Sequence, residues 1–320
     1  VTSQLLSPEL YSYNYLLDGV KIVDPGSVYI TRDITSETNI FILSDKKGDC
    51  GDLYTVNEVP HGNVSKVWYD SPTLKMQRRM TVYTPAGYDK GKDYPVLYLL
   101  HGAGGDEDAW TTLGRAQHIL DNLIATGKAK PMVVVMTNGN PNCQAAPGEW
   151  SAGQYIPSFY GYQGAKPAAT MDESFPDVMN YVESHYKVAK DKAHRAICGL
   201  SMGGGHSFDI SRRFPTKFDY IGLFSAGLHV STTGDFRNDF YKQLQGNEEA
   251  KTQLAILFKN KPKLYWIGMG KTDFLYKSSA DLRRYFDEKG YKYTYMETEG
   301  GHIWRNWRVY LTEFAQKIFK

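Results

Sequence analysis

The sequence predicts an α/β protein with a mostly parallel central sheet and, before it, a small antiparallel segment of β-sandwich type. After residue 62, short apolar runs alternate with amphipathic helical stretches, as in parallel sheets covered by helices. Before it, alternating aromatic residues and tight-turn dipeptides indicate hairpins. With 320 residues, 42% of them hydrophobic, the chain can bury a large core. We therefore expect a module over residues 1–62 and a larger domain over residues 63–320.

The segment at residues 1–62 follows β-hairpin patterns. Tyr11, Tyr13 and Tyr15 alternate with other residues, and Asp18-Gly19 is a typical two-residue turn. A further strand is predicted at residues 38–43, and no long helix is expected before about residue 105. Because complete sandwiches have about seven strands, this segment is predicted to be a partial module.

The larger part opens with two antiparallel strands, at residues 64–69 and 77–83. Apolar runs typical of strands buried on both faces follow at 96–100, 132–136, 195–198, 220–224, 264–267 and 291–296. Helical patterns lie at 117–126, 174–185, 203–214, 279–289 and 304–318. This alternation predicts a sheet whose functional loops gather at the carboxyl ends of its strands.

Charge and cysteine content exclude several classes of protein. The chain has 37 Lys and Arg against 35 Asp and Glu, so a net charge of +2 gives no field to attract nucleic acid or an anionic membrane. Three cysteines cannot make a disulfide scaffold, and no apolar run is long enough for a membrane span. The first residue is Val rather than Met, which indicates a trimmed or mature chain in which an export signal cannot be read.

The sharpest motif is a GxSxG sequence centred on Ser201, between the strand at 195–198 and the helix that begins near Gly203. A nucleophile elbow turns so tightly that its flanking residues must be small, and glycines satisfy this need. The alternative is a phosphate-binding turn. No P-loop lysine follows and the GxGxxG spacing is absent, so we interpret Ser201 as a nucleophile.

A serine nucleophile needs a histidine base, which follows the acid in this order of strands. His302 comes after the last predicted strand in a glycine-rich loop, and we predict that it is the base. His206 and His229 come too early to follow a plausible acid. His185 and His194 precede the nucleophile, and we expect both on the surface.

Asp273 is the predicted acid, because it lies in a glycine-rich loop after the strand at 264–267. The alternative role for Asp273 is a helix N-cap. Asp209 and Asp235 are weaker candidates since both precede the last two strands.

The developing oxyanion requires two backbone donors, each stabilising the transition state by roughly 3 kcal/mol. The amide of Met202, next to the nucleophile, is one candidate. The glycine-rich loop after the strand at 96–100 supplies the other, from Gly102 or Ala103, and the sequence does not separate these two.

Three segments together resemble the feruloyl esterase and esterase D-like group of α/β-hydrolases, carbohydrate esterase family one. They are residues 94–102, the elbow at 199–204, and residues 300–308 with His302. The resemblance implies the α/β-hydrolase fold and a triad of Ser201, Asp273 and His302. It also likens residues 13–25 to early-set, immunoglobulin-like modules of carbohydrate-active esterases. Such a module could bind glycans, but we expect it chiefly to pack against the catalytic domain.

The long polar loop at residues 138–170 is the predicted substrate-binding segment. Aromatic rings that could stack on an aryl group or a sugar, and polar groups that could bind hydroxyls, are Trp150, Tyr155, Phe159, Tyr160, Glu149 and Gln154. The alternative for each is a surface loop that packs on itself.

These observations predict a serine esterase that releases ferulate or a related hydroxycinnamate from arabinoxylan, with no cofactor and no metal. The substrate class suggests a secreted or periplasmic protein. The alternatives are an acetyl xylan esterase, an S-formylglutathione hydrolase-like thioesterase and an inactive glycan-binding protein. The sequence contains no HExxH motif and no cluster of His and Cys residues, so it does not indicate a metal hydrolase.

Overall fold

The computed structural model describes residues 5–150, 167–230 and 239–320, and its centre is a mixed sheet of eight strands. In the order in which they lie side by side, the strands are β13 (Thr294–Thr298), β12 (Leu264–Gly270), β11 (Tyr220–Phe224), β10 (Arg195–Leu200), β8 (Val96–Leu100), β9 (Val133–Thr137), β7 (Met76–Thr84) and β6 (Asn63–Ser71). Pairing is parallel from β13 to β9, and β7 and β6 run antiparallel at the edge. The predicted α/β-hydrolase fold is therefore confirmed.

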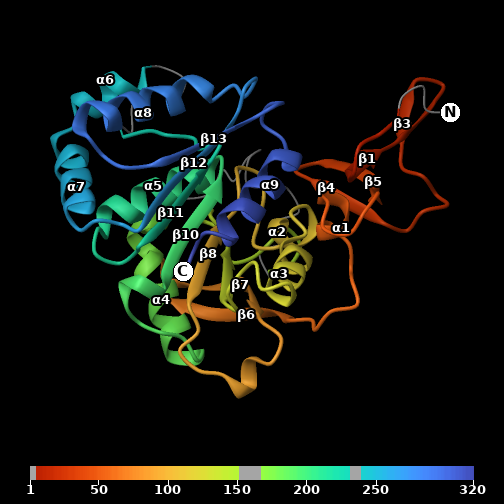
Figure 1. Ribbon diagram of the computed structural model, residues 1–320, viewed down its shortest axis with the longest axis horizontal. Helices are drawn as coiled ribbons and strands as arrows, with labels where there is room; N and C mark the ends of the chain where they lie inside the picture. Colours follow the sequence, from red (N-terminus) through yellow and green to blue (C-terminus); the bar gives the residue numbers. More distant parts are fainter. Residues whose placement is uncertain (1–4, 151–166, 231–238) are drawn as a thin grey trace.

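Helices cover both faces of this sheet (Figure 1). One layer is formed by α4 (Met171–His185), α5 (Met202–Arg213), α6 (Phe240–Gln245), α7 (Glu248–Lys259) and α8 (Tyr276–Lys289). The other contains α2 (Ala109–Thr112), α3 (Ala116–Ala125) and α9 (Trp304–Ala315). The apolar core forms one cluster on each side, because the central strands are buried on both faces. None of the described helices is long and apolar enough to cross a bilayer.

Three of these helices, α2, α6 and α7, were not predicted. With four residues, α2 is a single turn. With six residues, α6 is too short to show a helical period. α7 buries only Ala250, Leu254 and Leu257, a narrow apolar stripe in a largely polar segment. The helices α6 and α7 are recognisable only once their packing against the α5 and α8 layer is known.

The N-terminal segment is antiparallel, as predicted. β1 (Glu9–Tyr13), β5 (Ser36–Leu43) and β4 (Ile30–Asp33) form a three-stranded sheet, and β2 (Tyr15–Leu17) pairs with β3 (Val20–Ile22) in a hairpin. The hairpin turn has positive φ at Asp18 (49°) and Gly19 (84°), as a type I′ turn requires. A short helix, α1 (Cys50–Tyr54), capped by Asp49, follows; it was not predicted.

This segment packs directly on the helices of the larger part. Buried Arg308 of α9 forms an ion pair with buried Glu9 of β1, with 2.9 Å between Nη2 and Oε1. Asn122 of α3 donates to the carbonyls of Leu53 and Thr55, each at 3.0 Å. Such buried polar contacts fix the position of the segment against α3 and α9, and the division at residue 62 remains a prediction.

Candidate active site

Ser201 occupies the sharp turn between β10 and α5. Its backbone angles, φ 51° and ψ −115°, lie in a region that costs a non-glycine residue about 1–3 kcal/mol. Two backbone hydrogen bonds hold this conformation: Ser201 N donates to Phe224 O at 2.9 Å, and Gly227 N donates to Ser201 O at 2.8 Å. The strain is thus imposed by the neighbouring strand β11, as expected for a nucleophile elbow.

Close backbone approach explains the glycines around the elbow. A Cβ at Gly203 would lie 2.5 Å from the carbonyl oxygens of Leu100 and His101. A Cβ at Gly199 would lie 2.5 Å from the carbonyl oxygen of Gly203. These contacts press the end of β8 against the elbow, so the loop that follows β8 lies beside Ser201.

The structure brings His302 and Asp273 together. Nδ1 of His302 is 2.9 Å from Oδ2 and 3.1 Å from Oδ1 of Asp273, whose side chain is fully buried. The two loops are joined by a hydrogen bond from Thr272 N to Gly300 O at 3.0 Å. Asp273 Oδ1 also accepts from Leu275 N at 2.9 Å, yet Asp273 does not cap α8, since the N-cap residue is Leu275.

Aromatic side chains fix the imidazole of His302. The ring of Phe274 lies 4.5 Å from it, and that of Trp307 lies 4.9 Å away at 85°. Because Asp273 occupies Nδ1, the nitrogen left for proton transfer is Nε2. His302 and Ser201 line the same cavity.

The loop after β8 carries the predicted oxyanion donors. Gly102 and Ala103 both line the cavity with Ser201. Met202 is the first residue of α5, so its N–H has no acceptor within the helix. The carbonyl of Gly102 accepts from Gly105 N at 3.1 Å and is 2.7 Å from Nδ1 of His101.

His101 is a buried residue to which the sequence analysis assigned no role. Its Nε2 accepts from the backbone N–H of Gly139 at 2.7 Å, so Nδ1 carries the proton and donates to Gly102 O. Burial lowers the pKa of His101 and keeps the ring neutral. His101 therefore ties the loop after β8 to the segment after β9.

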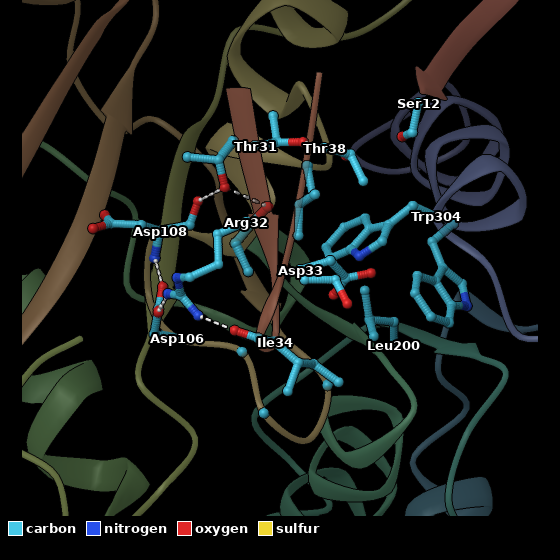
Figure 2. Close-up of a pocket in the computed structure, with 18 of the residues that line it drawn as sticks. Ser12, Thr31, Arg32, Asp33, Ile34, Thr38, Asp106, Asp108, Leu200 and Trp304 are labelled. Atoms are coloured by element: carbon cyan, nitrogen blue, oxygen red, sulfur yellow. Dashed lines mark hydrogen bonds and ion pairs between the residues drawn. The ribbon is translucent and has the colours of Figure 1, made fainter. Parts of the chain in front are cut away.

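A cavity of about 700 Å³ connects these groups with the N-terminal segment. Figure 2 shows the β4–β5 hairpin with Arg32 next to Asp106 on one side and Asp33 next to Trp304 on the other. The hairpin and the loops that carry Ser201 and His302 thus form two walls of the cavity. No local motif in residues 30–38 indicated this contact, and the sequence analysis missed it.

The predicted substrate-binding residues are only partly visible. Glu149 lines the cavity, and its Oε2 accepts from Nη1 of Arg79 at 2.9 Å. Buried Arg79 also contacts Glu107 at 2.7 Å and Asp108 at 3.1 Å, so Glu149 belongs to a fixed charge network. Trp150 is half-buried beside it and is not a cavity-lining residue. Four further predicted residues lie outside the described part of the chain: Gln154, Tyr155, Phe159 and Tyr160.

The weaker candidates for the triad have other roles. Asp209 pairs with Arg212 at 2.7 Å. His206 lies on α5 and is absent from the cavity lining, and burial lowers its pKa to about 4. His185 and His194 are exposed, as predicted, and Asp235 lies outside the described residues.

Comparison with known proteins places this geometry in a family. The model of the Esterase family matches residues 71–318. A curated protein of Xylanibacter ruminicola, an endo-1,4-beta-xylanase/feruloyl esterase, is 31% identical over 325 residues, which is 98% of this chain and 39% of that protein. The chain therefore spans about two fifths of the length of this relative.

Two further similarities differ in what they support. A CE1 ferulic acid esterase from the anaerobic fungus Anaeromyces mucronatus superposes with a TM-score of 0.63 at 26% identity, over 84% of this chain and 96% of that one. An acetyl esterase of Caldicellulosiruptor saccharolyticus is 23% identical over 78% of this chain and 90% of that protein. The first of these proteins is named for a ferulic acid ester, and the second for an acetyl ester.

Proposed function

Since the chain belongs to the Esterase family, we propose that it is a serine carboxylic-ester hydrolase that releases ferulate or related hydroxycinnamates from arabinoxylan. One observation carries this proposal. The strained Ser201 lines the same cavity as His302, whose Nδ1 is bound to the buried carboxylate of Asp273. This set supplies a nucleophile, a base and a group that orients the base.

In the proposed reaction, Ser201 Oγ attacks the ester carbonyl while Nε2 of His302 accepts the hydroxyl proton. His302 then donates this proton to the sugar oxygen as the C–O bond of the ester breaks, which leaves an acyl-enzyme. Water, activated by the same nitrogen, attacks the acyl group and releases the aromatic acid. Asp273 stays ionised, holds the Nδ1–H tautomer of His302 and stabilises the transient imidazolium.

The geometry of one peptide favours Ala103 over Gly102 as the second oxyanion donor. In a trans peptide the carbonyl of Gly102 and the N–H of Ala103 point in opposite directions. The carbonyl is directed at the buried ring of His101, so the N–H of Ala103 is directed away from that ring, and Ala103 lines the cavity. With the N–H of Met202 it would stabilise the oxyanion, each donor by roughly 3 kcal/mol.

The choice of substrate rests on the relatives and on the cavity. The protein matched along nearly the whole chain is named as a xylanase and feruloyl esterase, and the matched fungal structure is a ferulic acid esterase. A cavity of about 700 Å³ is large enough for an aromatic acid together with a sugar. Arabinoxylan is a plant cell-wall polymer, so we propose a secreted or periplasmic location.

Two ester substrates test the proposal directly. We expect wild type to hydrolyse methyl ferulate with a higher kcat/KM than 4-nitrophenyl acetate, and Ser201→Ala to lose both activities by at least about 10⁴-fold. Ser184→Ala, an exposed serine on α4, is the matched control and should keep full activity. Rapid cleavage of the acetate without cleavage of the ferulate would replace the proposal with an acetyl esterase. Full activity of Ser201→Ala would refute the serine mechanism.

A further inference from the structure

The tip of the β4–β5 hairpin places a carboxylate in the cavity. Asp33 ends β4 and pairs with Ser36 of β5 across a two-residue turn. Ile34 in this turn has φ 56°, which is rare for a β-branched residue and costs roughly 1–3 kcal/mol. A strained turn persists only where surrounding contacts hold it.

Arg32 provides these contacts. Its Nη1 donates to the carbonyl of Ile34 at 2.8 Å, and its Nη2 forms an ion pair with buried Asp106 at 2.7 Å (Figure 2). Asp106 belongs to the loop that also carries Gly102 and Ala103. The hairpin tip is therefore clamped to the loop beside the nucleophile, and Asp33 is presented to the cavity.

Asp33 retains unused capacity to accept hydrogen bonds. Trp304 lies beside the Asp33 carboxylate (Figure 2), and Asp33 forms no ion pair with any residue that the structure describes. Its side chain is exposed to the solvent inside the cavity, while the surrounding walls desolvate it and raise its pKa. An ionised carboxylate offers about four acceptor positions, so further donors from a bound molecule would stabilise it.

The position of Trp304 shows which part of the substrate lies beside Asp33. Trp304 follows His302 by two residues, and both line the cavity with Trp307. His302 returns the proton to the leaving alcohol, so groups on its side face the alcohol part of the ester. Trp304 packs edge-on against Trp110 at 5.3 Å and against Trp307 at 5.2 Å, which fixes its ring.

We propose that Asp33 and Trp304 form the subsite that recognises the sugar leaving group of the ester. The carboxylate of Asp33 accepts hydrogen bonds from neighbouring hydroxyls of a pentose, and the indole of Trp304 packs against its C–H face. The ester's chemical identity rests on the function proposed above. Asp33 is thus a specificity-determining residue contributed by the N-terminal segment.

Two esters with the same acyl group and different alcohols test this subsite. For Asp33→Ala we expect kcat/KM on feruloyl-arabinose to fall about 10- to 100-fold, mainly through KM, as for a lost hydrogen bond to a charged group. The rate on methyl ferulate should stay within about two-fold, because methanol has no hydroxyl beyond the ester oxygen. Asp18→Asn is the matched control, since Asp18 lies in the exposed β2–β3 turn and Asn tolerates its positive φ.

A binding measurement keeps this result separate from the ester chemistry. In the Ser201→Ala background, calorimetric titration with an arabinose-substituted xylo-oligosaccharide that lacks ferulate should show binding that Asp33→Ala weakens at least about ten-fold. Equal binding with and without Asp33, no binding in either protein, or equal loss of rate on both esters would overturn the subsite. Failure of wild type to cleave methyl ferulate would count against the proposed function alone.

Discussion

The two walls of the cavity are built in different ways. On one wall, Ser201 and His302 each follow a strand of the central sheet, and backbone hydrogen bonds between neighbouring loops set their positions. On the other wall, the β4–β5 hairpin lies far earlier in the chain than Ser201, at residues 30–43. The ion pair of Arg32 with Asp106 links this hairpin to the loop after β8.

In the proposed function, the wall formed by the sheet loops carries the reaction chemistry, and the wall formed by the hairpin contributes to the choice of substrate. The sheet wall, which carries Ser201 and His302, is attached to the central strands, so its backbone cannot shift without disturbing them. Catalytic groups need such rigid positioning. The hairpin wall depends on a few side chains, so single substitutions can alter it while the sheet remains intact. Substitutions on the sheet wall should therefore lower the rate of hydrolysis of every ester alike. Substitutions on the hairpin wall should instead alter selectivity between esters, or weaken the contact between the N-terminal segment and the larger part.

Asp273→Asn is expected to have the largest effect on the sheet wall. An amide in place of the carboxylate favours the wrong tautomer of His302 and removes the charge that stabilises its imidazolium, so kcat should fall about 10³- to 10⁴-fold. Steady-state rates on methyl ferulate and 4-nitrophenyl acetate should fall in the same proportion. Asp281→Asn, on α8, is the control because its Lys277 partner is exposed. A loss below ten-fold, or a loss on one ester only, would contradict the role of Asp273.

The joint between the two walls depends on the buried pair of Arg308 and Glu9. Arg308→Leu leaves the carboxylate of Glu9 buried without its main partner, so the free energy of unfolding should fall by about 3–5 kcal/mol. Arg305→Leu is the matched control. Arg305 is half-exposed and lies 3.4 Å from the same carboxylate, so its loss should cost about 1 kcal/mol or less.

Urea denaturation of both variants measures this difference. If Arg305→Leu lowered the free energy of unfolding as much as Arg308→Leu, the burial of the Arg308–Glu9 pair would not explain its contribution to stability. If neither substitution changed the free energy of unfolding, the N-terminal segment would not be anchored through Glu9.

The sequence leads to the proposed groups of the sheet wall because their positions follow from local rules. The glycines around Ser201 mark a turn that only small residues permit, and the order of Asp273 and His302 after successive strands places both at one sheet edge. The structure adds the hydrogen bond between them. It also adds the orientation of the Gly102–Ala103 peptide, which favours Ala103 as the oxyanion donor. This orientation depends on the hydrogen bond between His101 and Gly139, which are 38 residues apart in the sequence.

The hairpin wall could not be predicted in the same way. The sequence predicts a strand at residues 38–43, within β5, but none at β4. It also does not say which surface the hairpin contacts, because that depends on pairs such as Arg32 with Asp106, 74 residues apart. The sequence analysis therefore assigned substrate contacts only to the loop at residues 138–170. Of its six candidates, Glu149 lines the cavity, and four lie outside the described residues and remain predictions.

The walls also differ in their expected response to acid, since α5, which begins at the elbow of the sheet wall, carries a partly buried neutral histidine. His206 lies on α5, its Nδ1 is shielded from solvent, and burial lowers its pKa to about 4. In the unfolded chain the pKa of histidine is about 6.5, so as the pH falls below that value the unfolded state binds the proton first and stability falls. Between about pH 7.5 and about pH 5 this one group should account for a loss of about 2 kcal/mol.

Urea denaturation at the two pH values, with wild type and His206→Gln, measures this contribution. Gln does not titrate, so the variant should lose about 2 kcal/mol less than wild type on acidification. His185→Gln, at an exposed position on α4, is the control for replacing a histidine elsewhere in the chain. If His206→Gln kept the wild-type pH dependence, the acid sensitivity would arise elsewhere, and the buried imidazole behind the elbow would not distinguish the two walls.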